Sequence, residues 1–136
     1  MAKIKFAFEK SSSEIFGSVW RPVAKVGFWS SKINSWVDVI MIVDTGADYT
    51  ILPRFYAFDL GISLHKDCVS FKTFGIGGSE KVYLLKNAKV KLGKWVRFVP
   101  IGFLDRDDIP PLLGRQEFLE IFKVTLINHS TIFSDR

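Results

Sequence analysis

Short strand-forming runs separated by turn residues make up most of this 136-residue chain. Within each run, apolar and β-branched residues alternate with polar ones or cluster, as in strands that pack against a core. The expected strands are KIKFAF, SVWRPVAKVGFW, SWVDVIMIV, YTILP, CVSFKTF, KVYLL, AKVKL, WVRFVPIGFL, KVTLI and TIFS. Turns are expected at EKSSSE, SKIN and GIGGSE, and short helical pieces at RFYAFDLGI and RQEFLEIF. The pattern predicts an all-β fold, a closed barrel or sandwich, with one or two short helices.

Two local signals refine how the strands join. Pro22 lies inside a strand-forming run and has no backbone N–H, so an edge or a bulge is expected there. The last two runs flank Asn128, His129 and Ser130 and are expected to form a hairpin. No repeat, low-complexity tract or linker divides the chain, so residues 1–136 are expected to form one domain.

The composition favours a folded protein away from membranes. Hydrophobic residues make up 48% of the chain and charged residues 24%, which argues against disorder. The apolar run at residues 39–43 is far too short to span a bilayer. Residues 1–10 mix lysines with apolar residues and lack the apolar segment of a signal peptide. We therefore expect a cytoplasmic protein with no membrane partner.

The cysteine and histidine content argues against a metal site. Cys68 is the single cysteine of the chain, so no internal disulfide can form. His65 lies three residues before it, but with only His129 in addition, the ligands are too few for zinc. We therefore interpret His65 and Cys68 as structural and expect no metal and no cofactor.

The net charge of +5 raises the alternative of a nucleic-acid partner. In the densest basic stretch, KNAKVKLGKWVRF, lysines alternate with apolar residues, as on a strand with one solvated face. Nucleic-acid binding would require stacking aromatics or a reading element within such a patch, and no such motif is present. We therefore expect no nucleic-acid partner and rank a basic nucleic-acid-binding domain as the weakest alternative.

The stretch IMIVDTGADYTILP, residues 40–53, places two carboxylates four residues apart at the end of an apolar run. Gly46 permits a tight turn and close backbone approach, and Thr45 adds a hydroxyl group. Backbone amides near Gly46 could then hold the Asp44 carboxylate. One interpretation is an Asx turn in which Asp44 caps its own backbone. The other is a carboxylate held ready for chemistry.

Two later motifs favour the second interpretation. FKTFGIGGSEKVY is a hairpin whose tip is rich in glycine, and PPLLGRQEF places a glycine and then Arg115 after an apolar strand end. Together with VDTGAD, and in this order, the motifs resemble those of retropepsin-like aspartic proteases, the retroviral-type single-domain relatives of pepsin. The resemblance runs from about residue 39 to residue 119. VDTGAD is its most specific part, whereas LLGR alone would be weak.

The resemblance implies a role for each matching residue. Asp44 would be the catalytic carboxylate, and Thr45 would hydrogen-bond to its symmetry mate. Gly46 would contact the substrate backbone, and Asp48 would lie at the edge of the cleft, paired with Arg115. The active-site loop would comprise Thr45, Gly46, Ala47 and Asp48, and the flap would comprise Phe74, Gly75, Ile76, Gly77 and Gly78.

The chain departs from retroviral members in three places. Phe74 stands where they usually have another flap glycine, which leaves flap mobility open. The segment before Asp44 is longer than theirs, and the last stretch, FKVTLINHSTIFSDR, is a longer hairpin than their terminal strand. The chain is more similar to cellular or microbial members, so the layout of a retroviral dimer is not carried over.

Peptide hydrolysis by this chemistry requires two carboxylates that share one proton. The chain contains one Asp-Thr-Gly, and Asp48 cannot reach the same water around the turn, so a second Asp44 is expected from a second copy. We therefore expect a homodimeric aspartic endopeptidase that binds an extended protein or peptide substrate and prefers apolar residues around the scissile bond. The alternative is a catalytically weak dimeric binding or scaffolding module of the same fold.

Overall fold

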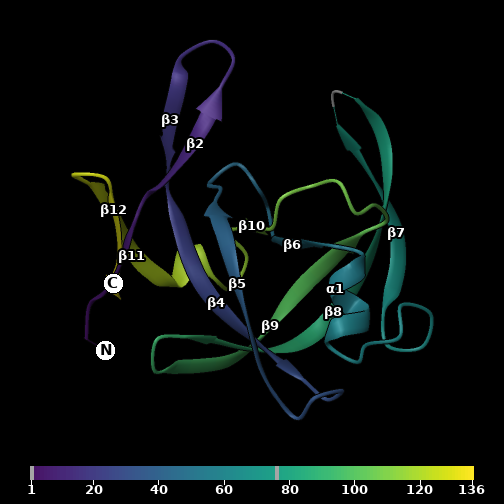
Figure 1. Ribbon diagram of the computed structural model, residues 1–136. Helices are drawn as coiled ribbons and strands as arrows, with labels where there is room; N and C mark the ends of the chain where they lie inside the picture. The colour runs from purple at the N-terminus through teal and green to yellow at the C-terminus, as the bar shows by residue number, and fades with distance from the viewer. Residues whose placement is uncertain (1, 76) are drawn as a thin grey trace.

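Strands dominate the part of the chain that this computed structural model describes, residues 2–75 and 77–136 (Figure 1). The strands are β1 Ile4–Ala7, β2 Glu9–Ser13, β3 Gly17–Arg21, β4 Val23–Ser30, β5 Ser35–Val43, β6 Thr50–Pro53, β7 Val69–Gly75, β8 Gly78–Leu92, β9 Trp95–Leu104, β10 Leu112–Leu113, β11 Phe122–Ile127 and β12 Ser130–Asp135. The helices are α1, Phe55–Asp59, and a 3₁₀ helix η1, Leu119–Ile121. Neither of these helices is long and apolar enough to cross a membrane. The prediction of an all-β fold with short helices is confirmed.

The largest sheet closes on itself. Its strand order is β4-β5-β10-β6-β9-β8-β7, and β4 also pairs with β8, where Gly27 meets Lys91 and Phe28 meets Val90. Strand β10 lies parallel to β5 and antiparallel to β6, while β6 lies parallel to β9. Because β10 pairs with β5 on one side and β6 on the other, this short strand lies inside the sheet and not at its edge.

The interior of the closed sheet forms the hydrophobic core. Along β5, Val39, Met41 and Val43 are buried while Ile40 between them is exposed, which is the period of two expected for a strand. Burying a side chain of this size stabilises the fold by about 1.5–3 kcal/mol. The largest fully buried side chains are Phe28, Phe103, Phe118, Phe133, Met41, Leu52, Leu60, Leu92, Ile101, Leu113, Val26 and Val39.

A smaller sheet of order β1-β12-β11 packs beside the closed sheet. The turn between β11 and β12 contains Asn128 and His129, whose φ angles are 49° and 53°. Two successive residues in the left-handed region match the right-handed twist of a tight hairpin. The hairpin predicted at the end of the chain is therefore confirmed. Phe133 and Phe122 meet edge-on in this sheet, with ring centroids 5.6 Å apart, and both are buried.

Strands β2 and β3 form a separate hairpin, and the turn predicted at EKSSSE is wrong. Residues 9–13 pair with residues 17–21 in antiparallel register, so the tip lies at residues 14–16. Serine has a low intrinsic strand preference, so only the pairing with β3 shows that β2 is a strand. Pro22 lies between β3 and β4, so the run expected to continue through it with an edge or a bulge is divided into two strands.

The short helix predicted at RQEFLEIF is found only at its end, as the 3₁₀ helix η1. Residues 115–118 form turns, and helical structure is limited to η1. Glu117 has a φ angle of 52°, a left-handed conformation that an α-helix cannot continue through. Arg115 therefore begins a turn and not a helix. The separate strands predicted at KVYLL and AKVKL are both part of β8, with a register shift between Leu85 and Ala88.

Candidate active site

The loop that joins β5 to β6 carries the Asp-Thr-Gly motif at one end of the closed sheet (Figure 1). The Asp44 N–H donates to the carbonyl oxygen of Leu113 in β10 at 3.0 Å. One residue earlier, the Val43 N–H donates to the carbonyl oxygen of Pro22 at 2.9 Å. Neighbouring segments on both sides therefore fix the chain where the loop begins.

The loop itself holds the half-buried Asp44 carboxylate. Its Oδ1 accepts the Gly46 N–H at 2.9 Å, and the Ala47 N–H donates to the Asp44 carbonyl oxygen at 3.1 Å. A Cβ atom on residue 46 would lie only 3.2 Å from Oδ1, so glycine leaves room beside the carboxylate. This is the Asx turn of the first interpretation. The turn also gives the carboxylate a fixed direction, which a catalytic role requires.

Arg115 holds the other side of the loop. Its Nη1 donates to the Thr45 carbonyl oxygen at 2.6 Å, and its Nη2 donates to Asp48 Oδ1 at 2.7 Å. Its backbone N–H donates to the Ala47 carbonyl oxygen at 3.0 Å. The Arg115 and Asp48 side chains are 43% and 80% exposed in the single chain. The structure contains the pair implied by the resemblance, but as an exposed pair, worth about 0–1 kcal/mol.

Gly114 lets β10 pass directly behind the loop. A Cβ atom on residue 114 would overlap the backbone carbonyl group of Tyr49 and lie 2.8 Å from its Cα. The buried Gly114 N–H donates to Thr50 Oγ1 at 3.2 Å. The end of the loop is therefore fixed against β10 just as its start is.

We expect Gly114→Ala to destabilise the fold by about 1–3 kcal/mol, because an added methyl group forces backbone apart in a packed interior. Urea denaturation of the two proteins measures the difference. Gly77→Ala is the matched control, since a Cβ atom on residue 77 meets nothing within 4 Å. If the two variants had the same free energy of unfolding, β10 and the loop could move apart to admit the methyl group without loss of stability.

Tyr49 connects the loop to the β7–β8 hairpin. Its ring lies against Gly102 of β9, where a Cβ atom would come within 2.7 Å of the ring. It also meets Phe71 of β7 edge-on, with ring centroids 6.2 Å apart. Burial, and then the neighbouring charge of Asp48, raise the pKa of the Tyr49 phenol, so the hydroxyl stays neutral. Sequence reasoning missed Tyr49, since its contacts come from distant strands and no local motif marks it.

Four of the predicted flap residues, Phe74, Gly75, Gly77 and Gly78, lie in the β7–β8 hairpin. Gly75 pairs with Gly78, and the Phe74 side chain is 81% exposed. Gly78 has a φ angle of 113°, a conformation that favours glycine. Ile76 lies outside the described residues. Figure 1 shows this hairpin rising from the end of the molecule that carries the Asp44 loop, and its closure over a substrate stays a prediction.

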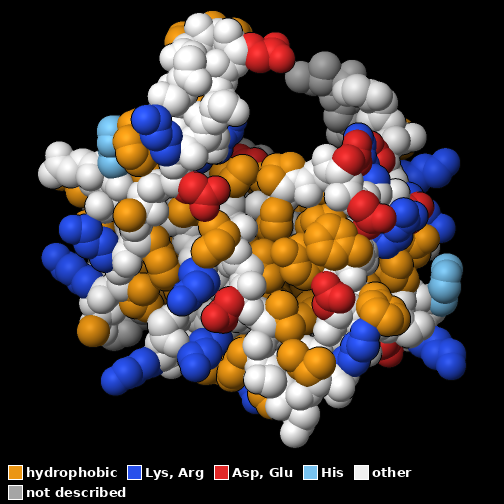
Figure 2. Space-filling model, in the orientation of Figure 1, with side chains coloured by type: hydrophobic (Ala, Val, Ile, Leu, Met, Phe, Trp, Pro, Cys, Tyr) orange, Lys and Arg blue, Asp and Glu red, His pale blue; other side chains and the backbone are white. Residues whose placement is uncertain are grey.

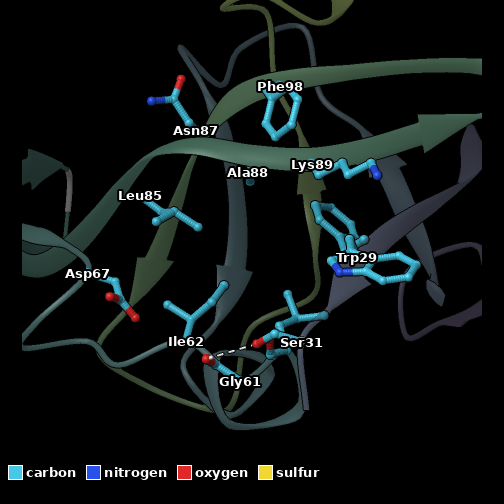
Figure 3. Close-up of a pocket in the computed structure, with 12 residues that line it drawn as sticks. Trp29, Ser31, Gly61, Ile62, Asp67, Leu85, Asn87, Ala88, Lys89 and Phe98 are labelled. Atoms are coloured by element: carbon cyan, nitrogen blue, oxygen red, sulfur yellow. Dashed lines mark hydrogen bonds between the residues drawn. The ribbon is translucent and has the colours of Figure 1, made fainter. Parts of the chain in front are cut away.

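The pocket drawn in Figure 3 lies apart from the Asp44 loop. It has a volume of about 440 Å³, and none of residues 44–48 lines it. Its walls come from β4, β8, β9 and the segment after α1, and include Phe28, Ile62, Leu85 and Phe98. We assign this pocket no part in the candidate active site.

His65 and Cys68 make separate structural contacts. The His65 ring meets Tyr83 edge-on, with centroids 6.0 Å apart. Burial, with a smaller effect from Asp67, raises the pKa of the Cys68 thiol to about 11, so little reactive thiolate is present near neutral pH. Across residues 2–75 and 77–136, no group of three or more His, Cys, Asp or Glu side chains is placed to hold a metal ion.

Comparisons with known proteins give the family. The family described as Aspartyl protease matches residues 29–116, which include the Asp44 loop and Arg115. The comparison with curated proteins gave no match. Among solved structures, a retropepsin-like aspartic protease from Rickettsia conorii is similar over 97% of this chain and 98% of that chain, with a TM-score of 0.66 and 22% identity. The resemblance inferred from the three motifs is confirmed: the fold is retropepsin-like, and the chain belongs to the aspartyl protease family.

Proposed function

We propose that the protein is a homodimeric aspartic endopeptidase in which Asp44 of each copy supplies one of two catalytic carboxylates. The observation that carries this proposal is the single oriented carboxylate of Asp44 beside the exposed residues Thr45 and Gly46. The other acid of the loop, Asp48, is already paired with Arg115. In the proposal, Asp44 of one copy is half of the acid–base pair. A two-fold axis beside Thr45 would bring the second half from another copy.

In the proposed reaction the two Asp44 carboxyl groups share one proton and hold one water molecule between them. The ionised group takes a proton from the water while the water oxygen attacks the peptide carbonyl carbon. The protonated group gives its proton to the carbonyl oxygen. The carboxyl group that took the water proton then gives it to the amide nitrogen. As the C–N bond breaks, one hydroxyl group of the tetrahedral intermediate returns its proton to the pair, and a carboxylic acid and an amine leave. The pair again shares one proton, so the cycle can repeat.

The proposed substrate is an extended polypeptide with apolar side chains around the scissile bond. Strand β7 lies at the end of the strand order, so one of its edges is free to pair with an extended chain. Phe71 and Phe74 expose aromatic side chains along this strand. Both features suit a substrate that is held by its backbone and selected by apolar side chains.

The direct test incubates the wild-type protein with a pool of synthetic peptides between acid and neutral pH. Mass spectrometry of the products should show internal cleavage beside apolar residues. Peptides that are captured but never cut would instead support the alternative of a catalytically weak binding or scaffolding module.

Arg115→Ala is expected to lower kcat/KM by about 10²-fold, because small misplacements of catalytic groups carry costs of that order. The substitution removes the side-chain contacts to Thr45 and Asp48, next to the surface where we place the second copy. The free energy of unfolding should change by only about 1 kcal/mol, since the pair is exposed. Arg115→Lys should be intermediate, because a lysine cannot span both acceptors as a guanidinium does.

Arg54→Ala is the matched control for this substitution. Arg54 also contacts two acceptors, Asp105 at 3.1 Å and Asp107 at 3.2 Å, and its side chain is 46% exposed. It should show a similar small loss of stability with a much smaller loss of turnover. Equal losses of turnover in Arg54→Ala and Arg115→Ala would refute the assignment of Arg115 as the residue that positions the loop.

A further inference from the structure

The β2–β3 hairpin lies outside the closed main sheet. Among residues 2–75 and 77–136, its two strands pair with each other alone, as a two-stranded sheet. Such hairpins are marginally stable in water unless something else supports them. Its base and its tip are supported very differently.

The base of the hairpin is firmly attached to the rest of the fold. The His129 ring stacks between Trp20 and Phe8, with centroid distances of 4.9 Å and 5.6 Å. The Phe8 N–H also donates to the His129 carbonyl oxygen at 2.8 Å. Lys10 lies over the Trp20 ring, 5.8 Å from its centroid. The base therefore holds the hairpin in a defined direction.

The tip of the hairpin instead presents two large apolar side chains to solvent. Ile15 is 83% exposed and Phe16 is 75% exposed. The backbone beneath them is ordered, since the Phe16 N–H donates to Ser13 Oγ at 3.1 Å and the Ser18 N–H donates to the Phe16 carbonyl oxygen at 2.8 Å. An anchored hairpin that keeps two such residues out of the core is typical of a surface that binds something.

This apolar tip stands beside the proposed cleft. Pro22 follows β3 directly, and its carbonyl oxygen accepts the N–H of Val43, the residue before Asp44. In Figure 1 the β2–β3 and β7–β8 hairpins rise from the same end of the molecule, on either side of the loop between β5 and β6. Figure 2 shows an open hollow between them. Each hairpin exposes apolar side chains, Ile15 and Phe16 at the tip of β2–β3 and Phe74 in β7.

We propose that the β2–β3 hairpin is a second wall of the substrate cleft, and that Ile15 and Phe16 bind apolar side chains of an extended peptide at positions away from the scissile bond. This inference rests on the proposed function, because it names what would set the substrate preference of that site. We assign an extended peptide as the occupant, because the two hairpins rise on either side of the loop between β5 and β6, which carries the proposed catalytic Asp44 (Figure 1). A peptide that crosses Asp44 there passes one hairpin and then the other.

The proposal predicts a dependence on peptide length, because Ile15 and Phe16 lie at the end of a hairpin and not at the loop. The test uses one cleaved sequence in two forms, about six and about fourteen residues long, so that at about 3.3 Å per residue only the longer form reaches the tip. For Ile15→Ser/Phe16→Ser, the ratio of kcat/KM for the long form to that for the short form should fall at least about tenfold, the discrimination that an apolar contact gives.

The matched control is Ile33→Ser/Phe58→Ser, which removes an exposed isoleucine and an exposed phenylalanine from the β4–β5 turn and α1. Its long-to-short ratio should equal that of the wild type. The dimer dissociation constant of each variant is measured by sedimentation. If the hairpin variant loses both peptide lengths equally and dimerises more weakly, the tip contacts a second copy and the proposal fails. An unchanged ratio also overturns it.

Peptide binding to the Asp44→Asn protein separates this inference from the proposed function. The peptide pool is captured on immobilised Asp44→Asn protein with and without the two hairpin substitutions, and the bound peptides are sequenced. Hairpin-dependent capture of long peptides without any wild-type cleavage would refute the hydrolysis and keep the second wall. Cleavage together with hairpin-independent capture would refute the second wall and keep the hydrolysis. Neither capture nor cleavage would refute both.

Discussion

Asp44→Asn should lower peptide hydrolysis at least about a hundredfold, since general acid–base catalysis contributes typically 10²–10⁴-fold. Asparagine keeps the size of the side chain, and its Oδ1 can still accept the Gly46 N–H. It cannot take or give the proton, and in a homodimer one substitution removes both carboxyl groups of the pair. The variant should therefore fold, dimerise and bind peptide while kcat falls to background. The measurement is kcat and KM on one mapped peptide, with urea denaturation to verify the fold.

Asp38→Asn is the matched control for charge. Asp38 lies in β5, the strand that leads into the Asp44 loop, and its side chain is exposed. The control should retain wild-type turnover. If Asp44→Asn kept more than about a hundredth of the wild-type rate, the assignment of Asp44 as acid and base would be wrong.

The features that the sequence predicted correctly are those encoded by neighbouring residues. Alternation along residues 35–43 identifies β5, and the apolar run ends where Asp44 begins the loop. The Asx turn needs only Asp44 and the N–H two residues later, so Asp-Thr-Gly alone predicts it. The tight turn at Asn128 and His129 is likewise a local signal between two strand patterns.

The features that the sequence missed depend on partners far along the chain. Strand β2 exists because residues 17–21 pair with it, although its serines favour turns. The periodicity of RQEFLEIF resembles a helix, but Arg115 is held by Thr45 and Asp48 from another part of the chain, and Glu117 turns the backbone left-handed. Contacts of this kind leave no local pattern, which is why the contacts of Tyr49 and the β2–β3 hairpin were not predicted.

Specific activity is expected to fall as the protein is diluted through its dimer dissociation constant, because each site needs Asp44 from two chains. A monomeric enzyme would keep constant activity per chain. The measurement is activity per mole over a dilution series, with sedimentation in parallel. Two copies joined by a flexible linker are the control, since the linker makes assembly intramolecular and should remove the dependence. Full activity in a fully monomeric protein would refute the shared site.

Mixing wild-type protein with Asp44→Asn protein tests the same claim at constant total concentration. Where chains exchange freely, an equal mixture should lower the activity per wild-type chain to about half, and a ninefold excess of the variant to about a tenth, because mixed dimers hold one carboxyl group. Adding Asp38→Asn protein instead should cause no loss.

The pH dependence should follow from the shared proton. With rising pH both carboxyl groups ionise, so the general acid is lost and two like charges at hydrogen-bonding distance oppose assembly. With falling pH both are protonated, and no base remains to activate the water. The rate should therefore depend on pH as a bell-shaped curve, with both limbs belonging to the pair. In the linked two-copy protein the dimer cannot be diluted apart, so its alkaline limb reports the loss of the acid alone. If the unlinked protein lost activity at the same pH as the linked protein and remained a dimer there, charge repulsion would not control assembly.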